Sequence, residues 1–254
     1  MEIILNERNK AVEILKTKEI GKNITQCLSV LAKYFYSPVI SDFELYEILN
    51  DFMHKNFKGY NSDNWKSCIE YQIKLAKKHK LIEIEYISVT ENELRTIKSL
   101  NNKRLERLSF TILIVAKYYN EISESNNNWV NREFKSLFTM ANIAATQDVQ
   151  CDMIFKLKNL NMIGLSKKID NLNLNVKYID EESSEILKIT DMRNLGNQYR
   201  LYCKDKGYKK CKCCERVIKI KKNQMYCKDC SRAVNRKNQR EWSLKNKEKI
   251  EPNF

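Results

Sequence analysis

Four cysteines near residue 220 constrain this chain more than any other feature of the sequence. They form two Cys-x-x-Cys pairs, Cys211/Cys214 and Cys227/Cys230, with twelve residues between the pairs. Each pair can fold into a tight backbone knuckle, and two knuckles supply the four thiolates of a tetrahedral zinc site. The spacing therefore predicts a zinc ribbon around one structural Zn²⁺. Because four thiolates leave no coordination position open, we do not expect this ion to catalyse a reaction.

Other cysteines leave the ligand set open. Cys213 lies inside the first pair, so that Cys211/Cys213 is an alternative to Cys211/Cys214, and Cys203 is a weaker candidate. Three more cysteines fall on apolar faces of expected helices, where a buried thiol acts as a small hydrophobic group: Cys27, Cys68 and Cys151. The first ten residues, MEIILNERNK, carry no apolar leader, so we expect a cytoplasmic protein with thiols in place of disulfides.

Positive charge is concentrated around and after the cysteines. Residues 201–254 contain 17 Lys and Arg against 6 Asp and Glu, a net charge of +11, out of +14 for the whole chain. A local polycation beside a near-neutral body favours binding to a phosphate backbone, which weakens as the salt concentration rises. The alternative is a solvated, solubilising tail.

The segment 231–249 lacks Gly and Pro, and we expect a basic helix there with Ser231 as its N-cap. Its Arg and Lys side chains would contact phosphates. Trp242 would either stack on a base or pack against the ribbon. The candidate contacts in this segment are Arg232, Arg236, Lys237, Arg240, Trp242, Lys245 and Lys247.

The rest of the chain has few breakers of secondary structure. Five Gly and two Pro, together with apolar residues at helical spacing, predict a mainly α fold with small β-hairpins. Ser41 with Glu44, and Thr90 with Glu93, have the spacing of capping boxes. We expect strands at 81–87, at 162–168 and 172–179 around an Asp170–Asn171 turn, and at 217–220 and 224–226. The longest apolar stretch, residues 110–116, is too short to span a membrane.

Three helices followed by a hairpin are the order of a winged helix-turn-helix. The stretch that begins at Cys68 resembles the stretch that begins at Cys151, at an offset of 83 residues, and this repeat favours two tandem units. The alternative is that helical patterning in a Lys- and Leu-rich chain imitates a repeat. We therefore predict four segments: a helical, helix-turn-helix-like domain at 1–100, a winged-helix-like domain at 101–180, a linker at 181–202, and the zinc ribbon with its basic helix at 203–254.

The expected recognition helix, about 146–160, gives a mixed signal. Amide and basic side chains on it and on the following wing are candidate contacts to DNA: Gln147, Gln150, Lys156, Lys167 and Lys168. Asp148 and Asp152 on the same helix would repel phosphate. Because winged helices also dock proteins or form dimers, both roles stay open for this unit.

No catalytic motif is present in the sequence. The only histidines, His54 and His79, each stand next to Lys in an expected helix, and there is no phosphate-binding loop or dinucleotide fingerprint. We expect a protein that is not an enzyme.

Several stretches together resemble a family of proteins. The chain is similar to uncharacterised proteins of phages and other mobile elements in low-GC bacteria. The stretches that carry the resemblance are ITDMRNLGNQYRLY, the cysteine pair in YCKDC and the basic RAVNRKNQRE, together with WVNREFKSLF and NLNMIGLSKKIDNLNLNVKYID in the body. Cys213 inside the first pair and Glu215, where a ribbon often has Gly, depart from the zinc pattern. The resemblance implies a mobile-element setting, which suits a DNA-binding, replication-associated or host-interfering protein.

We therefore expect a zinc-containing protein that is not an enzyme and that binds nucleic acid. Duplex DNA is the favoured ligand, and RNA is the second choice. The helical body would supply site reading or homodimer formation. The alternative is an adaptor or inhibitor that binds a host protein or ribonucleoprotein, such as a polymerase or a defence complex.

Overall fold

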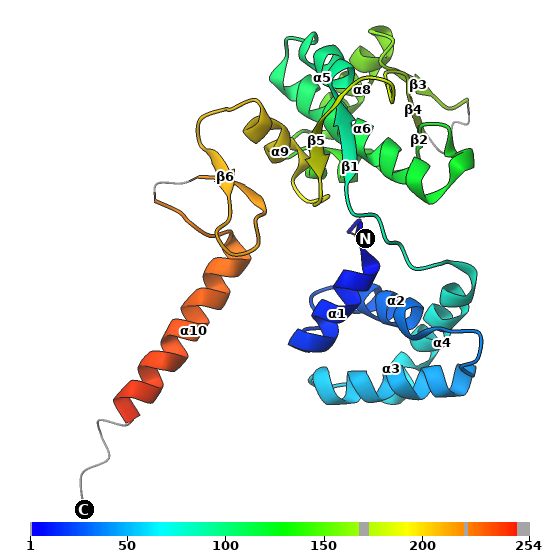
Figure 1. Ribbon diagram of the computed structural model, residues 1–254, viewed down its shortest axis with the longest axis vertical. Coiled ribbons are helices and arrows are strands. Elements are labelled where there is room, and N and C mark those ends of the chain that lie inside the picture. The colour runs from blue at the N-terminus through cyan, green and yellow to red at the C-terminus, as the bar shows by residue number, and fades with distance from the viewer. Residues whose placement is uncertain (1, 168–172, 221–222, 248–254) are drawn as a thin grey trace, which may run out of the picture. The chain divides into compact units, whose positions relative to one another are not determined.

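The computed structural model describes residues 2–167, 173–220 and 223–247, the last three as backbone only (Figure 1). The described chain is mainly helical with small antiparallel sheets, which confirms the predicted fold class at that level. It divides into two compact units. Unit 1 comprises residues 1–89, 117–127 and 185–192, and unit 2 comprises residues 90–116, 128–184 and 193–254.

These units do not follow the predicted domain boundaries. The expected linker 181–202 contains strand β5 (Glu185–Ile189), which belongs to unit 1, and helix α9 (Leu195–Tyr202), which belongs to unit 2. The change in charge near residue 200 suggested a boundary there. Charge reports the solvated surface, whereas the units are set by which apolar faces pack together.

Unit 1 is built on four helices. They are α1 (Glu7–Thr17), α2 (Ile24–Phe35), α3 (Asp42–Asn56) and α4 (Ser62–Lys78). Side chains of Asn6, Asn23, Ser41 and Asn61 accept hydrogen bonds from the first-turn amides, and the Ser41–Glu44 capping box is confirmed. Helix α2 packs against the other three, and its Leu28 and Leu31 are fully buried. Amphipathic spacing therefore specifies this core.

A largely buried ion pair lies beside this core. The Glu7 carboxylate accepts from Lys33 Nζ at 2.9 Å and from the Ile82 amide at 2.9 Å. The Glu7 and Lys33 side chains are only 10% and 12% exposed. Glu7 thus joins α1, α2 and the segment after α4.

The predicted strand at 81–87 is confirmed only as extended backbone. Glu83 forms an isolated antiparallel bridge with Asn6, and the Ile84 amide donates to Leu5 at 2.9 Å. Regular strand geometry begins at β1 (Ile87–Thr90), whose partner is β5. Residues 2–100 are all described, and no β-hairpin follows α4 within them.

Unit 2 begins with the confirmed Thr90–Glu93 capping box, which starts α5 (Glu91–Lys98). Helix α6 (Lys103–Ile122) follows and belongs to unit 2 through residue 116; its end and the short helix η1 (Glu124–Asn126) belong to unit 1. Unit 2 continues with β2 (Trp129–Val130), α7 (Phe134–Met140), α8 (Gln147–Asn159), β3 (Ile163–Leu165) and β4 (Leu174–Val176). The three strands form an antiparallel sheet in the order β2-β4-β3, with Gly164 opposite Asn175. The predicted hairpin is confirmed as β3–β4. The expected turn at Asp170–Asn171 and Lys168 lie outside the described residues.

Three more elements follow α9: β6 (Tyr208–Lys210), β7 (Val217–Lys219) and α10 (Lys228–Lys247). The predicted pairing of 217–220 with 224–226 is wrong, because β7 pairs antiparallel with β6, with Lys210 opposite Val217. The sequence pattern suggested the shorter loop, whereas the chain closes its hairpin through the first cysteine pair. No helix among the described residues is long and apolar enough to cross a membrane.

Candidate metal centre and basic helix

The first cysteine pair forms the turn of the β6–β7 hairpin. The Cys211 amide donates to the Arg216 carbonyl at 2.9 Å, which extends the ladder by one rung beyond Lys210 and Val217. The Glu215 amide donates back to the Cys211 carbonyl at 3.0 Å. Glu215 itself has a left-handed backbone, with φ of 56°, a conformation that favours Gly. The hairpin therefore presents both sulfurs from one tight knuckle.

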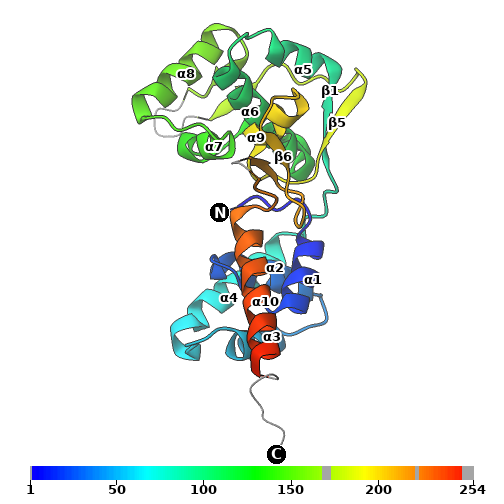
Figure 2. The same cartoon turned by 90° about the vertical axis from the view of Figure 1, so that its left-hand side faces the viewer.

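The second cysteine pair starts α10. The Ser231 amide donates to the Cys227 carbonyl at 2.8 Å, so that Cys230 lies in the first helical turn. The prediction that Ser231 caps this helix is wrong by one turn, because the helix begins at Lys228. Figure 2 shows α10 continuing from this pair as a single helix. The same residues thus hold two sulfurs and fix the start of the helix.

Polar contacts join the two knuckles. The Lys212 amide donates to the Met225 carbonyl at 3.1 Å, and the Cys227 amide donates to Cys211 Sγ at 3.2 Å. Arg216, from the first knuckle, pairs with Asp229 of α10 at 3.2 Å. These contacts bring the pairs face to face.

The four predicted ligands lie close enough to hold a metal ion. The sulfurs of Cys211, Cys214, Cys227 and Cys230 all lie within 4.8 Å of one another, and Cys214 and Cys227 are separated by 3.7 Å. Cys211 and Cys227 are buried, and the other two are half-buried. Cys213, by contrast, is exposed and does not belong to this group, and Cys203 ends α9.

The electrostatics of the four thiols suit a cation. Burial raises the pKa of Cys211, but the amides of Cys214, Cys227 and Cys213 outweigh it and lower that pKa to about 6. Burial raises the pKa values of Cys214 and Cys230; neighbouring thiols raise that of Cys230 further, and the Cys227 and Cys211 thiols do the same for Cys214. A bound divalent cation offsets exactly this kind of penalty by stabilising thiolates. Four sulfurs without a carboxylate or imidazole are a donor set that suits zinc.

The other cysteines differ in burial. Cys27 is buried in the unit 1 core, and burial raises its pKa to about 11. Cys68 and Cys151 are only half-buried, less than their apolar helix faces suggested. His54 and His79 are both exposed, as expected for surface groups.

The basic side chains of α10 face solvent. Arg232, Arg236 and Arg240 are exposed and follow one another at a spacing of four residues, which places them in one stripe. Lys237 is also exposed and lies 3.8 Å from Glu241. Trp242 is 69% exposed, so it does not pack against the ribbon. The side chains of Lys245 and Lys247 lie outside the described part of the chain.

The outer face of α8 is less basic than the sequence suggested. Gln150 is half-buried and donates to the Ala145 carbonyl at 3.0 Å, which turns its amide away from any ligand. Gln147 and Lys156 are exposed, and so is Lys167 after β3. The face opposite the core instead carries Asp148, Asp152, Phe155 and Asn159, with Phe155 49% exposed. The structure therefore does not bring the predicted α8 contacts together into a basic surface.

Helix α9, which lies in the predicted linker, attaches the hairpin to α6. It packs against β6 and β7. Its buried Tyr199 donates to Glu106 at 3.1 Å, and the Tyr199 ring lies 5.2 Å from that of Phe110. A Cβ at Gly196 would lie 1.9 Å from the Ala141 carbonyl oxygen, so only Gly fits there. This close contact between two backbones explains why Gly stands inside α9.

Comparison with known proteins adds no relative: no family model, no curated protein and no solved structure matches the chain.

Proposed function

We propose that this chain is a non-enzymatic, zinc-containing protein that binds nucleic acid, duplex DNA in preference to RNA. The observation that carries the proposal is the exposed stripe of Arg232, Arg236 and Arg240 on α10. A solvent-exposed helix with stacked guanidinium groups can follow a phosphate backbone without reading its sequence. The net charge of +11 in residues 201–254 supports the same role.

In this proposal the four cysteines bind one structural Zn²⁺ that fixes the first turn of α10. Support comes from the cluster of sulfurs within 4.8 Å and from the location of Cys227 and Cys230 at the helix start. The hairpin buries little apolar surface of its own, so the ion supplies the stability that a core would supply elsewhere. The resemblance of the sequence to phage and mobile-element proteins supports such a setting.

We interpret α6, β2, α7, α8, β3 and β4 as a winged-helix-like unit. The support is the order helix, strand, helix, helix, strand, strand, together with the strand order β2-β4-β3. In α2–α4 of unit 1 the helix order is similar, without a wing. The acidic outer face of α8 favours docking over base reading for this unit.

The test is a titration of a fluorescent duplex of arbitrary sequence with the zinc-loaded chain at several salt concentrations. We expect log Kd to rise linearly with log salt, with a slope near 0.9 for each phosphate that is neutralised. The triple variant Arg232→Gln, Arg236→Gln, Arg240→Gln removes up to three contacts, so its slope should fall by roughly 2.7.

The matched control removes the same charge elsewhere. Lys66, Lys74 and Lys78 are exposed on α4, and their replacement by Gln changes the net charge by the same amount. If the control weakens binding as much as the arginine variant, net charge rather than the α10 stripe is responsible. A duplex RNA and a single strand measured at equal salt decide between the nucleic-acid classes.

A second candidate function is docking of a host protein or ribonucleoprotein. Two exposed surfaces favour it, each combining an apolar side chain with carboxylates: the α8 face around Phe155, and the start of α3, where Val39 and Phe43 are 93% and 73% exposed beside Glu47. A solvated apolar group framed by acids suits a basic, partly apolar partner.

Photocrosslinking separates this candidate from the first. A photoreactive residue at position 155 or 43 should capture one protein in cells, in a yield that survives nuclease and high salt. The same residue at Lys66 is the control, because it lies outside both surfaces. Crosslinks that disappear with nuclease would assign the partner to nucleic acid instead.

A further inference from the structure

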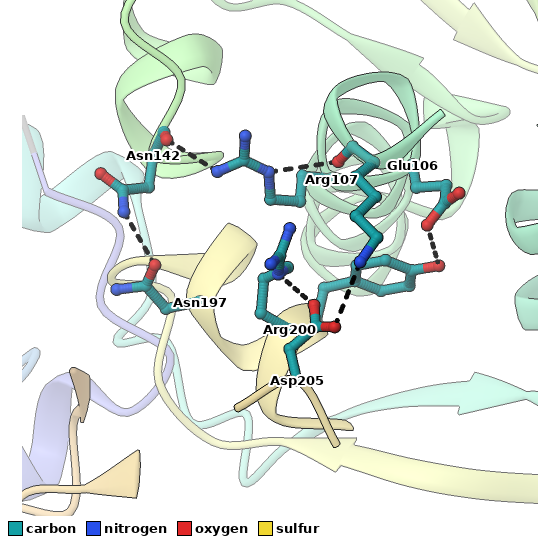
Figure 3. A network of polar contacts seen from close by, with 8 residues as sticks. Glu106, Arg107, Asn142, Asn197, Arg200 and Asp205 are labelled. Carbon is teal, nitrogen blue, oxygen red and sulfur yellow. Dashed lines mark hydrogen bonds and ion pairs between the residues drawn. The ribbon is translucent and has the colours of Figure 1, made fainter. Parts of the chain in front are cut away.

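The strongest unassigned feature is a chain of hydrogen bonds that leads from the metal-binding hairpin to the turn between α7 and α8. Asn197 of α9 is only 5% exposed, and its amide group connects the two ends. Its Nδ2 donates to the Val217 carbonyl in β7 at 3.4 Å, and its Oδ1 accepts from Asn142 Nδ2 at 2.8 Å. Figure 3 shows Asn142 and Asn197 facing each other.

The far end of this chain is the α7–α8 turn. Asn142 has a left-handed backbone with φ of 53°, and its carbonyl accepts from Arg107 of α6 at 3.0 Å (Figure 3). Arg104 holds the same turn two residues later through the Ala144 carbonyl, at 3.1 Å. Arg107 is half-buried, and this burial lowers the pKa of its guanidinium. The turn is therefore held from α6 on one side and from Asn197 on the other.

The near end is the metal site itself. Val217 is the β7 residue opposite Lys210, and the next residues inward are Arg216 and Cys211 of the first knuckle. When the metal orders this knuckle, it orders the carbonyl to which Asn197 donates. Gly196, the neighbour of Asn197, lies directly against the Ala141 backbone, so α9 contacts the turn at this point.

We propose that Asn197 couples metal occupancy of the four cysteines to the conformation of the α7–α8 turn, and so to the position of α8. Metal binding closes the knuckle, the knuckle fixes Val217, and Asn197 transmits that order to Asn142. Loss of metal frees the turn and loosens the acidic outer face of α8. This inference rests on the metal centre proposed above.

Hydrogen exchange measured with and without metal tests the coupling. The Asn142 and Ile143 amides donate within the turn at 3.0 and 2.9 Å and report its order. One hydrogen bond of ordinary strength changes an equilibrium by about two- to tenfold, so chelation should speed their exchange by that factor. Coupling is reciprocal, so breaking it should weaken Co²⁺ binding, followed by its thiolate absorption, by a similar factor.

The informative variant is Asn142→Gly. Gly adopts the left-handed backbone without strain and keeps the carbonyl for Arg107, so only the bond to Asn197 is lost. Replacing Asn197 directly would break its bonds to Val217 and to Asn142 together, so it would not isolate the contact with the turn. Asn101→Gly is the matched control, because Asn101 also has a left-handed backbone, with φ of 48°, and its side-chain amide donates to Ser99 in the same loop.

In Asn142→Gly, we expect turn exchange that no longer depends on metal and weaker Co²⁺ binding, whereas Asn101→Gly should behave as the parent chain. Turn exchange that is the same with and without metal, in a chain that binds Co²⁺, would overturn the coupling and leave the metal centre intact. A variant that retains the full metal dependence would also overturn it. Failure of the parent chain to bind Co²⁺ would instead remove the proposed metal centre.

Discussion

The helices α1–α4 and the β6–β7 hairpin with its cluster of cysteines differ in what can hold them in order. The four helices enclose a continuous apolar core that includes Leu28, Leu31 and Leu49. The cluster at the hairpin contains Ile218 and two of the candidate ligands, Cys211 and Cys227. A segment with so little apolar burial needs another source of stability, and four convergent sulfurs supply it when they bind a metal. Each region should therefore fail under a perturbation that the other tolerates.

Metal removal should give the largest difference between the two regions. Structural zinc contributes on the order of 10–16 kcal/mol to comparable segments, so a chelator or Cys227→Ser should unfold the hairpin and the start of α10. The α1–α4 core contains no candidate ligand and should keep its hydrogen-exchange protection. Zinc content and exchange rates, measured on one preparation, check both statements.

The matched control for this experiment is Cys213→Ser. Cys213 is exposed and does not belong to the sulfur cluster, so this variant should bind zinc as the parent chain does. Loss of zinc from Cys213→Ser with retention in Cys214→Ser would reassign the first pair to Cys211 and Cys213.

A cavity in the helical core should have the converse effect. Leu28 is fully buried at the centre of α2, and Leu28→Ala should lower the free energy of unfolding of unit 1 by about 2–5 kcal/mol. Co²⁺ affinity should not change, because Leu28 belongs to unit 1 and the four cysteines belong to unit 2. Urea unfolding followed by exchange in α1–α4 measures the first quantity. Val12→Ala, at a position that is 49% exposed, is the control and should change stability little.

The helices of unit 1 and the cysteine hairpin also differ in how much of their structure could be predicted from the sequence. Apolar spacing and the caps at Ser41 and Thr90 are local, so the helices of unit 1 and the start of α5 were predictable. The cysteine quartet was predictable because ligand spacing is a short-range property of the knuckles. The strand partner of β7 was not, because the choice between residues 208–210 and 224–226 depends on how the knuckle closes.

Helix α9 illustrates a second limit. Gly196 is a poor helix former, and nothing nearby in the sequence shows that Ala141 lies against it. The direction of the α8 side chains was similarly hidden, since Gln150 bonds to a carbonyl in its own turn region. At Gly196 a tertiary contact decides what local propensity leaves open, and at Gln150 a local side-chain bond does.

The ion pair in unit 1 should have an intermediate effect. Glu7→Gln keeps an acceptor for the Ile82 amide but leaves the Lys33 ammonium, 12% exposed, without its charge partner. A hydrogen bond to a charged group contributes roughly 1.5–3 kcal/mol, so unit 1 should lose stability of about that size. Glu83→Gln, in the exposed pair with Arg8, should have no measurable effect on urea unfolding. Equal losses in both variants would show that burial does not distinguish the pairs.

The smallest effect should come from the backbone of the first knuckle. Glu215 has a left-handed backbone, which costs a residue with a Cβ about 1 kcal/mol. Gly removes this strain, but its greater conformational freedom in the unfolded chain offsets part of the gain. Glu215→Gly should therefore tighten metal binding only about twofold, a difference of roughly 0.5 kcal/mol, because the hairpin orders as it binds.

The control for that variant separates backbone strain from charge. Glu215→Ala keeps the Cβ and removes only the contact with Lys210, which is 3.8 Å long and made by a side chain that is 81% exposed. A pair of that kind contributes little, so Glu215→Ala should bind Co²⁺ as the parent chain does. If Ala tightens binding as much as Gly, removal of the carboxylate is responsible, and the strain assigned to this knuckle is wrong. If only Gly does, the hairpin tolerates a strained residue because the metal, and not local backbone preference, determines its fold.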